Sequence, residues 1–405
     1  MLESLYSDRM GRMKSSEIRE LLKLMDRPGL ISFAGGIPDP DLFPKSAFAS
    51  AIDACLSGPD GAAALQYSVS EGFAPLREWI ATRMSAQGIA CDQDNIVITS
   101  GSQQALDYLG KLLVSRGETL LVGWPTYLGA LNAFNAFEPR FDRLDPNSNR
   151  SSADLAQAAQ ENGGRVKAMY LSTDFANPTG ETLDRTARER VLDLAEGLDC
   201  AIIEDAAYEA LRYDGEPLPS IMALELQRKG NLESCRTVYC GSFSKTLSPG
   251  LRVGWVVAAK PVISQLVLLK QAADLHSASL NQIAIHAVAT AHFDEHIQVL
   301  RKVYRSRRDA MLETLDAHMP EGVTWSRPQG GMFIWLNLPV GMDGSDLLAR
   351  ALEQENVAFV PGQAFFADGS GQNSIRLSFS CPSEDQISEG IRRLASVITN
   401  SMMQA

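Results

Sequence analysis

The chain has 405 residues, a formal net charge of −12, and 45% hydrophobic and 21% charged residues. This length predicts two or three units of about 100 to 200 residues, and we expect one large and one smaller domain. No apolar run approaches the roughly 18 residues of a membrane span, and the negative charge would repel nucleic acid and anionic lipid. These properties argue against a membrane protein and a nucleic-acid binder, and a small molecule is the expected partner.

The N-terminus, the cysteines and the histidines carry no targeting or metal signal. Residues 1–22 mix acidic with basic side chains and have no apolar core of a signal peptide, so a cytoplasmic location is expected. The six cysteines are scattered, and the nearest pair, Cys235 and Cys240, lacks C-x-x-C spacing. The three histidines between 286 and 296 are more typical of a polar helix face than of a metal site, so no metal is predicted.

The segment from 94 to about 258 alternates short apolar runs with helical patterns. The runs are NIVITSG (95–101), TLLVGWP (119–125), VKAMYLS (166–172), CAIIEDA (200–206), TVYCGS (237–242) and RVGWVVA (252–258). Several are apolar throughout, as expected for strands that helices cover on both faces. An α/β sheet, mostly parallel, is therefore predicted.

The pattern changes after about Pro261, where long helical segments precede strand-like runs and a final helix. Ser383 and Gln386 have capping-box spacing at the start of that helix. A separate α+β unit is predicted here, and a short amphipathic helix is expected near the N-terminus, around residues 18–25. The predicted division is an N-terminal segment at 1–45, a large domain at 46–285 and a small domain at 286–405.

One run of basic residues, RKVYRSRRD at 301–309, is the only stretch that favours nucleic acid. Apolar residues in the same segment recur with the spacing of one helix face. The run therefore predicts a solvated basic face of a long helix.

Glycine and polar residues follow several of the strand-like runs, where open α/β sheets bind their ligands. Gly101, Ser102 and Gln103 form a turn that opens a helix. This turn either binds a phosphate through the free N–H groups of the helix or only caps the helix. Asp205 follows another run, and it either caps a helix or needs a cationic partner near the core.

Lys245 follows the fifth run, with Ser242 and Ser244 before it and Arg252 after it. Desolvation near a buried strand lowers the pKa of a lysine, which frees its amine to attack carbonyl groups. Ser242 and Lys245 also match S-x-x-K of penicillin-binding proteins and class A β-lactamases, but the companion S-D-N and K-T-G motifs are absent. The lysine is therefore predicted to be the reactive group.

Taken in order, these motifs resemble the class I/II, fold-type-I aminotransferases that depend on pyridoxal 5'-phosphate (PLP). The series comprises the turn at 101–103, NPTG (177–180), DAAY (205–208), SFSK (242–245), GLRVGW (250–255) and the arginine of SIRLSFS (374–380). The resemblance implies a fold-type-I PLP transferase, with a mostly parallel mixed sheet between helices in a large domain and a smaller α+β domain.

The resemblance assigns catalytic roles to three residues. Lys245 would hold PLP covalently and later move the proton between the substrate Cα and the cofactor. Asp205 would pair with the ring nitrogen, and removing it would cost about 3 to 5 kcal/mol because a buried cation would lose its partner. Tyr208 would hydrogen-bond the ring hydroxyl, with Asn177 as a further cofactor contact beside it.

The remaining cofactor contacts implied by the resemblance surround the phosphate and the ring. The phosphate would be held by Gly101, Ser102, Gln103, Ser242, Ser244 and Arg252. Tyr127 would stack on one face of the ring, and Ala207 would fit the other. Tyr67 would reach a phosphate across a subunit interface, so a homodimer is implied.

The substrate residues follow from the same resemblance. Arg376 would grip the α-carboxylate with its bidentate fork, beside Asn177. SSEIREL (15–21) and LISFAGGIPDPDLFP (30–44) resemble the 2-aminoadipate and kynurenine aminotransferase group. Gly36 would then approach the substrate, and Arg19 would bind a side-chain carboxylate, act as a gate, or be a solvated helix residue.

The expected reaction moves the amino group of an L-amino acid to a 2-oxo acid such as 2-oxoglutarate. The donor would be 2-aminoadipate, glutamate, or an aromatic or branched-chain amino acid. A PLP-dependent lyase or decarboxylase on the same fold stays open, because the reaction depends on which Cα bond stands perpendicular to the ring. An effector domain of a transcription regulator is disfavoured, since the phosphate turn at 101 leaves little room for a preceding DNA-binding domain.

Overall fold

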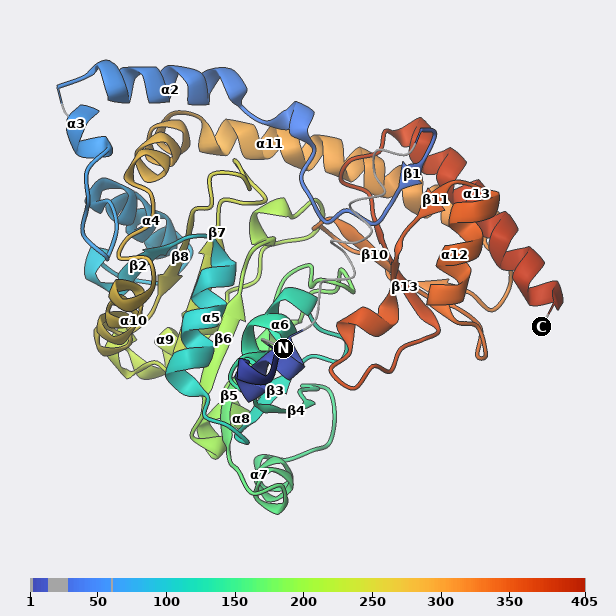
Figure 1. The fold of residues 1–405 in the computed structure, drawn as a ribbon, viewed down its shortest axis with the longest axis horizontal. Helices are drawn as coiled ribbons and strands as arrows, with labels where there is room; N and C mark the ends of the chain where they lie inside the picture. Colours follow the sequence, from blue (N-terminus) through green and yellow to red (C-terminus); the bar gives the residue numbers. More distant parts are fainter. Residues whose placement is uncertain (1–2, 14–27, 60, 405) are drawn as a thin grey trace.

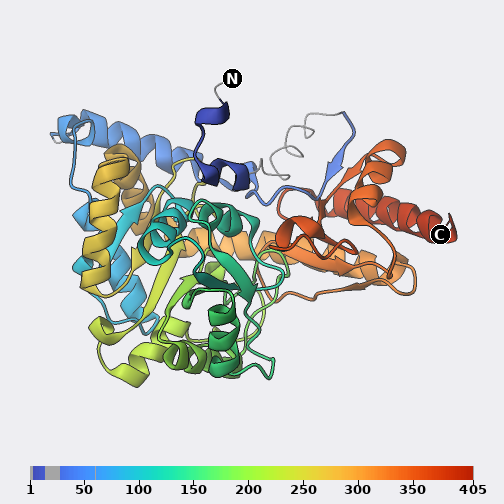
Figure 2. The same ribbon diagram turned by 60° about the horizontal axis from the view of Figure 1, so that its bottom comes forward.

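The computed structural model describes residues 3–13, 28–59 and 61–404. A large domain and a small domain lie at opposite ends of one long helix, α11 (Ser279–His318), as Figures 1 and 2 show. The helix predicted around residues 18–25, and Arg19 with it, lies outside the described residues.

The large domain is built on a seven-stranded sheet. Its strands in spatial order are β2 (Ile96–Thr99), β8 (Gly254–Val257), β7 (Thr237–Ser242), β6 (Ala201–Asp205), β5 (Val166–Leu171), β3 (Thr119–Val122) and β4 (Arg140–Arg143). Only β8 runs antiparallel to its neighbours. All six predicted runs are strands, which confirms the mostly parallel α/β sheet. The edge strand β4 was not predicted, because its sequence RFDR is charged and partly exposed.

Helices cover both faces of this sheet, which is why its central strands are apolar throughout. One face packs against α5 (Ser102–Leu113), α6 (Leu128–Asn135) and α10 (Lys260–Ala273). The other face packs against α7 (Ser152–Glu161), α8 (Arg185–Leu198) and α9 (Ile221–Lys229).

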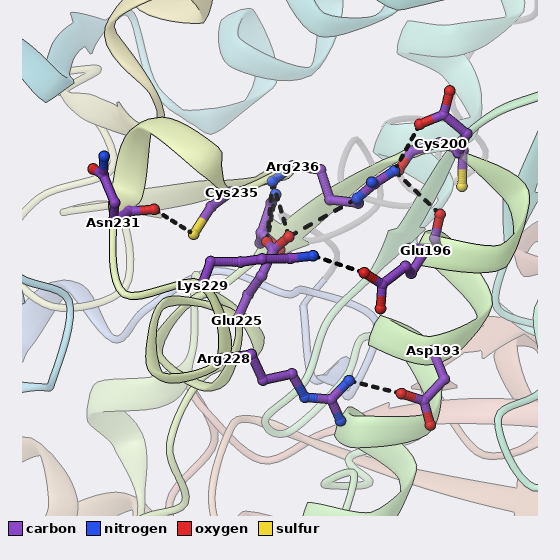
Figure 3. A network of polar contacts seen from close by, with 12 residues as sticks. Asp193, Glu196, Cys200, Glu225, Arg228, Lys229, Asn231, Cys235 and Arg236 are labelled. Atoms are coloured by element: carbon purple, nitrogen blue, oxygen red, sulfur yellow. Dashed lines mark hydrogen bonds and ion pairs between the residues drawn. The ribbon is translucent and has the colours of Figure 1, made fainter.

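Polar contacts hold the amino end of β7, as Figure 3 shows. The Glu225 carboxylate of α9 accepts hydrogen bonds from the backbone N–H groups of Arg236 and Thr237. Two ion pairs join α9 to α8: Arg228 with Asp193 and Lys229 with Glu196. The network anchors the end of the strand opposite Lys245 and leaves the carboxyl end open to the site.

The small domain contains an antiparallel four-stranded sheet and two helices. The strand order is β12 (Val360–Pro361), β13 (Ser374–Ser378), β10 (Phe333–Asn337) and β9 (Thr324–Trp325), with α12 (Gly344–Gln354) and α13 (Glu384–Gln404) beside it. The predicted capping box is present, since Ser383 N–H donates to Gln386 Oε1 at 3.0 Å and Gln386 N–H to Ser383 Oγ at 3.3 Å. The N-terminal strand β1 (Ile31–Ser32) pairs with β11 (Val357–Ala358), which docks the N-terminal loop on this domain.

Helix α11 packs against both domains. It contacts α13 of the small domain and, at its other end, α2 (Lys45–Ser57), α3 (Gly61–Ala64) and α4 (Ala74–Ala86). The proposed boundary at 285/286 falls inside this helix, and the domain limits stay a prediction. No helix within 3–13, 28–59 or 61–404 is long and apolar enough to cross a membrane.

The basic run on α11 differs from the solvated face predicted for it. Arg307 pairs with Asp39 at 2.7 Å, and Arg308 pairs with Asp214. Only 11% of the Arg307 side chain and 7% of the Arg308 side chain are exposed. The prediction is wrong for these two arginines, because acidic residues from distant loops cover them.

Short 3-10 turns complete the described elements. They lie at Glu3–Leu5, Asp8–Arg12, Pro40–Leu42, Gln93–Asn95, Glu209–Leu211, Leu232–Ser234 and Gly362–Phe365. The turn at Glu209–Leu211 directly follows Tyr208 and so ends the loop that leaves β6.

Candidate active site

Lys245 lies just beyond the carboxyl end of β7, facing the N-terminal loop. Its Nζ donates a hydrogen bond to the Gly36 carbonyl at 2.8 Å and lies 5.8 Å from the centroid of the Tyr208 ring. Burial lowers the pKa of Lys245 to about 8, and the positive charges of Arg376 and Arg252 contribute to this lowering. With that pKa, on the order of a tenth of the amine is neutral and nucleophilic at pH 7, and this share grows as the pH approaches 8.

Asp205 ends β6, which neighbours β7, the strand that precedes Lys245. Its Oδ2 accepts a 2.8 Å hydrogen bond from the Tyr170 hydroxyl, whereas its buried Oδ1 has no partner among the described residues. Burial raises the pKa of Asp205, although the Tyr170 hydroxyl, the Ala207 backbone N–H and the Lys245 charge act in the opposite direction. A buried acceptor without a donor is costly, so this oxygen is suited to a ligand that brings an N–H group.

Tyr170 was missed by the sequence analysis. It stands near the end of β5, beside Ile203 of β6, and is completely buried. The one available signal was a tyrosine near the end of a strand-like run, because a buried tyrosine hydroxyl usually has a hydrogen-bond partner.

Arg376 reaches the site from β13 of the small domain. One end nitrogen donates to Asn177 Oδ1 at 2.9 Å, the other donates to the Ala34 carbonyl at 2.8 Å, and Nε has no partner among the described residues. The guanidinium lies 4.3 Å from the ring centroid of Phe333. Burial lowers its pKa to about 10, and no carboxylate of the described chain pairs with it.

Such an arginine is suited to bind a carboxylate. A buried cation needs an anionic partner to offset its desolvation, and the guanidinium fork matches a carboxylate with two parallel hydrogen bonds.

The turn before α5 joins Gly101 to Arg252. Gly101 has a φ of +78°, a backbone conformation that residues with a side chain rarely adopt, and a Cβ there would displace the end of Arg252, which would lie 2.3 Å away. The backbone N–H groups of Ser102 and Gln103 then open the helix. The Gln103 side chain does not serve this turn, because its amide donates to the Gly129 carbonyl at 2.7 Å.

Arg252 also connects this turn with the loop after β7. It donates to the Ser100 carbonyl at 3.3 Å and lies 3.5 Å from Ser244 Oγ. Ser242 Oγ accepts from the Ser244 N–H at 3.0 Å. A helix N-terminus, a guanidinium and hydroxyls are the kinds of group that can bind a phosphate.

Three further residues were predicted to contact the cofactor or the substrate: Tyr127, Gly36 and Ala207. Tyr127 precedes α6, and burial and the nearby Asp205 charge raise its pKa. A Cβ on Gly36 would lie 3.0 Å from Phe333, so glycine lets the N-terminal loop approach closely. Ala207 is the second residue after β6, and it is partly buried.

Tyr67 is the exception, because 79% of it is exposed. Its ring packs edge-on against His276, with 6.0 Å between centroids. The single chain does not bring it to the groups described above.

The groups of this site match the parts of PLP. The Lys245 amine suits its aldehyde, Asp205 Oδ1 suits its ring N–H, and the start of α5 with Arg252 suits its phosphate. The groups extend from a mixed, mostly parallel seven-stranded sheet that carries a smaller α+β domain. Fold and site together define a PLP-dependent enzyme of fold type I.

Comparisons with known proteins agree. The family model of aminotransferase class I and II matches residues 39–394. A 2-aminoadipate transaminase from Thermus thermophilus is 43% identical over 95% of this chain and 94% of its own length. Aromatic-amino-acid aminotransferase 1 from Thermococcus litoralis is 41% identical over 99% of this chain and 95% of its own.

A solved structure extends the likeness to the fold. An α-aminoadipate aminotransferase from Thermus thermophilus, complexed with N-(5'-phosphopyridoxyl)-L-leucine, has a TM-score of 0.89 and 40% identity, covering 100% of both chains. The chain belongs to the aminotransferase class I and II family, and PLP is its cofactor. The predicted fold class and the predicted amino-transfer activity are confirmed.

Proposed function

We propose that this aminotransferase moves the α-amino group of an L-amino acid to 2-oxoglutarate or a similar 2-oxo acid, using the residues described above. The observation that carries the proposal is Arg376, a buried guanidinium with no acidic partner in the described chain. Every L-amino acid and every 2-oxo acid brings the carboxylate that this guanidinium lacks.

Lys245 and Asp205 are proposed to handle protons on either side of the ring. When bound, PLP supplies an aldehyde for the amino group and a ring that takes up the negative charge released at Cα. Lys245, with its pKa near 8, would accept and return the Cα proton at physiological pH. Asp205 would hold the proton on the ring nitrogen through Oδ1, and so keep the ring electron-withdrawing.

Neighbouring residues are proposed to orient the cofactor and to keep out water. Tyr208 would hydrogen-bond the ring hydroxyl, with Asn177 as a further cofactor contact beside it, and Tyr127 and Ala207 would bracket the ring. The N-terminal loop, through Gly36 and Ala34, would close the site above Lys245 and Arg376. Phosphate binding is proposed for the N–H groups of 102 and 103, with Ser242, Ser244 and Arg252.

The donor is proposed to be 2-aminoadipate, glutamate, or an aromatic or branched-chain amino acid. The similar proteins named above support the first and third of these. Arg19, which lies outside the described residues, would bind the side-chain carboxylate of dicarboxylic donors. An Arg19→Ala protein should then lose efficiency on 2-aminoadipate and glutamate while it keeps its efficiency on aromatic donors. If Arg19→Ala kept full efficiency on dicarboxylic donors, Arg19 would not bind their side-chain carboxylate.

A homodimer and the cytoplasmic location expected from the sequence complete the proposal. Leu65, Tyr67 and Val69 are exposed together between α3 and α4, and Leu275 is exposed beyond α10. Clustered exposed apolar residues mark an interaction surface, so Tyr67 would be covered by a second copy and reach its cofactor phosphate.

The test uses the purified full chain with PLP and a panel of L-amino acids. Spectral change of the cofactor reports each half-reaction, and product formation with 2-oxoglutarate reports the whole cycle. Lys245→Ala should abolish turnover, whereas Lys260→Ala, which removes a half-exposed lysine that pairs with Asp92, should not. Transamination by Lys245→Ala would refute the role of Lys245. Bound PLP without amino transfer from any donor would favour a lyase or decarboxylase.

A further inference from the structure

An ion pair between a buried lysine and a partly exposed carboxylate lies behind the turn that opens α5. Lys270, at the end of α10, has a side chain that is only 1% exposed and lies 3.0 Å from Asp274. Its ammonium also donates to Gln104 Oε1 and to Ser277 Oγ, each at 3.0 Å. All three donors of the ammonium are thus engaged, two of them outside the ion pair.

Asp274 binds the turn itself. Its Oδ2 accepts from Gln104 Nε2 at 2.7 Å and from Ser100 Oγ at 3.2 Å, and Oδ1 accepts from the Tyr108 hydroxyl at 3.2 Å. Gln104 and Tyr108 belong to the first two turns of α5, and Ser100 is the residue before Gly101. One carboxylate therefore joins both sides of the helix start.

Every polar group of Ser100 is consequently held in place. Its N–H donates to Gln104 Oε1 at 2.8 Å, its hydroxyl donates to Asp274, and its carbonyl accepts from Arg252 at 3.3 Å. Ser100 leads directly into the glycine of positive φ whose N–H neighbours are proposed to bind phosphate. Fixing Ser100 and Gln104 fixes the direction of the N–H groups between them.

We infer that Lys270 and Asp274 are positioning residues for the cofactor phosphate, which they never touch. They would keep the turn at 100–104 in its binding geometry before the phosphate binds. This preorganisation would raise the affinity of the protein for PLP. The inference rests on the proposed phosphate site.

The same segment touches the proposed subunit surface. The Ser277 carbonyl accepts from Gln282 Nε2 at 2.8 Å, and Gln282 Oε1 accepts from the Phe73 N–H at 2.7 Å. His276 packs against the ring of Tyr67. Residues 274–282 thus contact both groups that are proposed to bind phosphate. One is the turn at 100–104 of the same chain, and the other is the loop with Tyr67, which is proposed to reach the phosphate of the partner chain.

The test compares PLP with pyridoxal, which keeps the aldehyde and ring but lacks the phosphate. Dissociation constants are measured on the full chain after its cofactor has been removed. Asp274→Asn and Lys270→Met should each weaken PLP binding roughly tenfold and leave pyridoxal binding unchanged. Asp107→Asn is the matched control, because it neutralises a half-exposed acid of α5 that pairs with Lys111 and takes no part in this network.

Two further variants keep the outcome decisive. Ser100→Ala removes only one hydroxyl of the network, so it should fold and lower the preference for PLP over pyridoxal by a few fold. Arg252→Met tests the phosphate site itself. If Arg252→Met lowers the preference for PLP over pyridoxal while Asp274→Asn and Ser100→Ala leave it unchanged, the role of Lys270 and Asp274 is overturned and the phosphate site stands. An equal loss of PLP and pyridoxal binding in Asp274→Asn would also overturn it, whereas an unchanged preference in Arg252→Met would refute the phosphate site.

Discussion

Tyr170 donates a 2.8 Å hydrogen bond to one oxygen of Asp205 and leaves the other oxygen without a partner among the described residues. The two residues stand on neighbouring parallel strands, and both are buried. The hydroxyl thereby fixes the carboxylate and offsets part of the cost of burying its charge.

Replacing Tyr170 by Phe should therefore weaken the pairing of Asp205 with the ring nitrogen. Without the hydroxyl the pKa of Asp205 should rise further, because burial would be less well offset. We expect kcat to fall about tenfold, with a shift in the cofactor absorbance titration. Tyr239→Phe is the matched control, since Tyr239 is equally buried but bonds Glu209. An unchanged titration in Tyr170→Phe would contradict the prediction.

The rate at which the cofactor-free protein captures PLP should depend on pH through Lys245. The neutral amine is the nucleophile, so the rate should rise as pH increases and level off above about 8, the pKa of Lys245. Arg252→Met removes a neighbouring positive charge, so the pKa of Lys245 should rise and the midpoint should move to higher pH. Stopped-flow absorbance measures the capture rate against pH in the wild-type chain and in Arg252→Met. If the rate of the wild-type chain rose only around the pKa of an ordinary exposed lysine, the amine would not behave as a buried one.

Arg376→Lys should lower kcat/KM for all amino donors, by about 100-fold, mainly through KM. The lysine keeps the charge but loses the fork that matches a carboxylate. Arg392→Lys changes a half-exposed arginine that pairs with Glu389, and it should have no effect. A loss confined to dicarboxylic donors would mean that Arg376 binds the side chain instead of the α-carboxylate.

Tyr67 should act on the site of a partner chain. Tyr67→Ala and Lys245→Ala are each expected to be poorly active, the first through weaker PLP binding by about 1 kcal/mol or more. Mixed dimers of the two variants would contain one site with both native residues, and activity should partly return on mixing. Activity that stays at the sum of the two separate variants would argue against contribution across an interface.

The sequence indicated most of the large sheet because its strands are short, apolar and covered on both faces, a signal that is local. The ordered motifs from Gly101 to Arg376 likewise indicated the family, since each is a short run of neighbouring residues. The edge strand β4 escaped notice because exposure leaves its side chains charged. The burial of Arg307 and Arg308 was missed because their acidic partners come from distant loops.

The sequence by itself thus determined the chemical groups of the site: an amine, a carboxylate, a guanidinium and a helix N-terminus. Only the tertiary structure decided which partners those groups have. Arg376 meets Ala34 across 342 positions of the chain, and Lys270 meets Gln104 across 166. Burial and hydrogen bonding set the pKa and orientation of such groups. Those contacts depend on strand register and on the docking of the small domain, which no local pattern encodes.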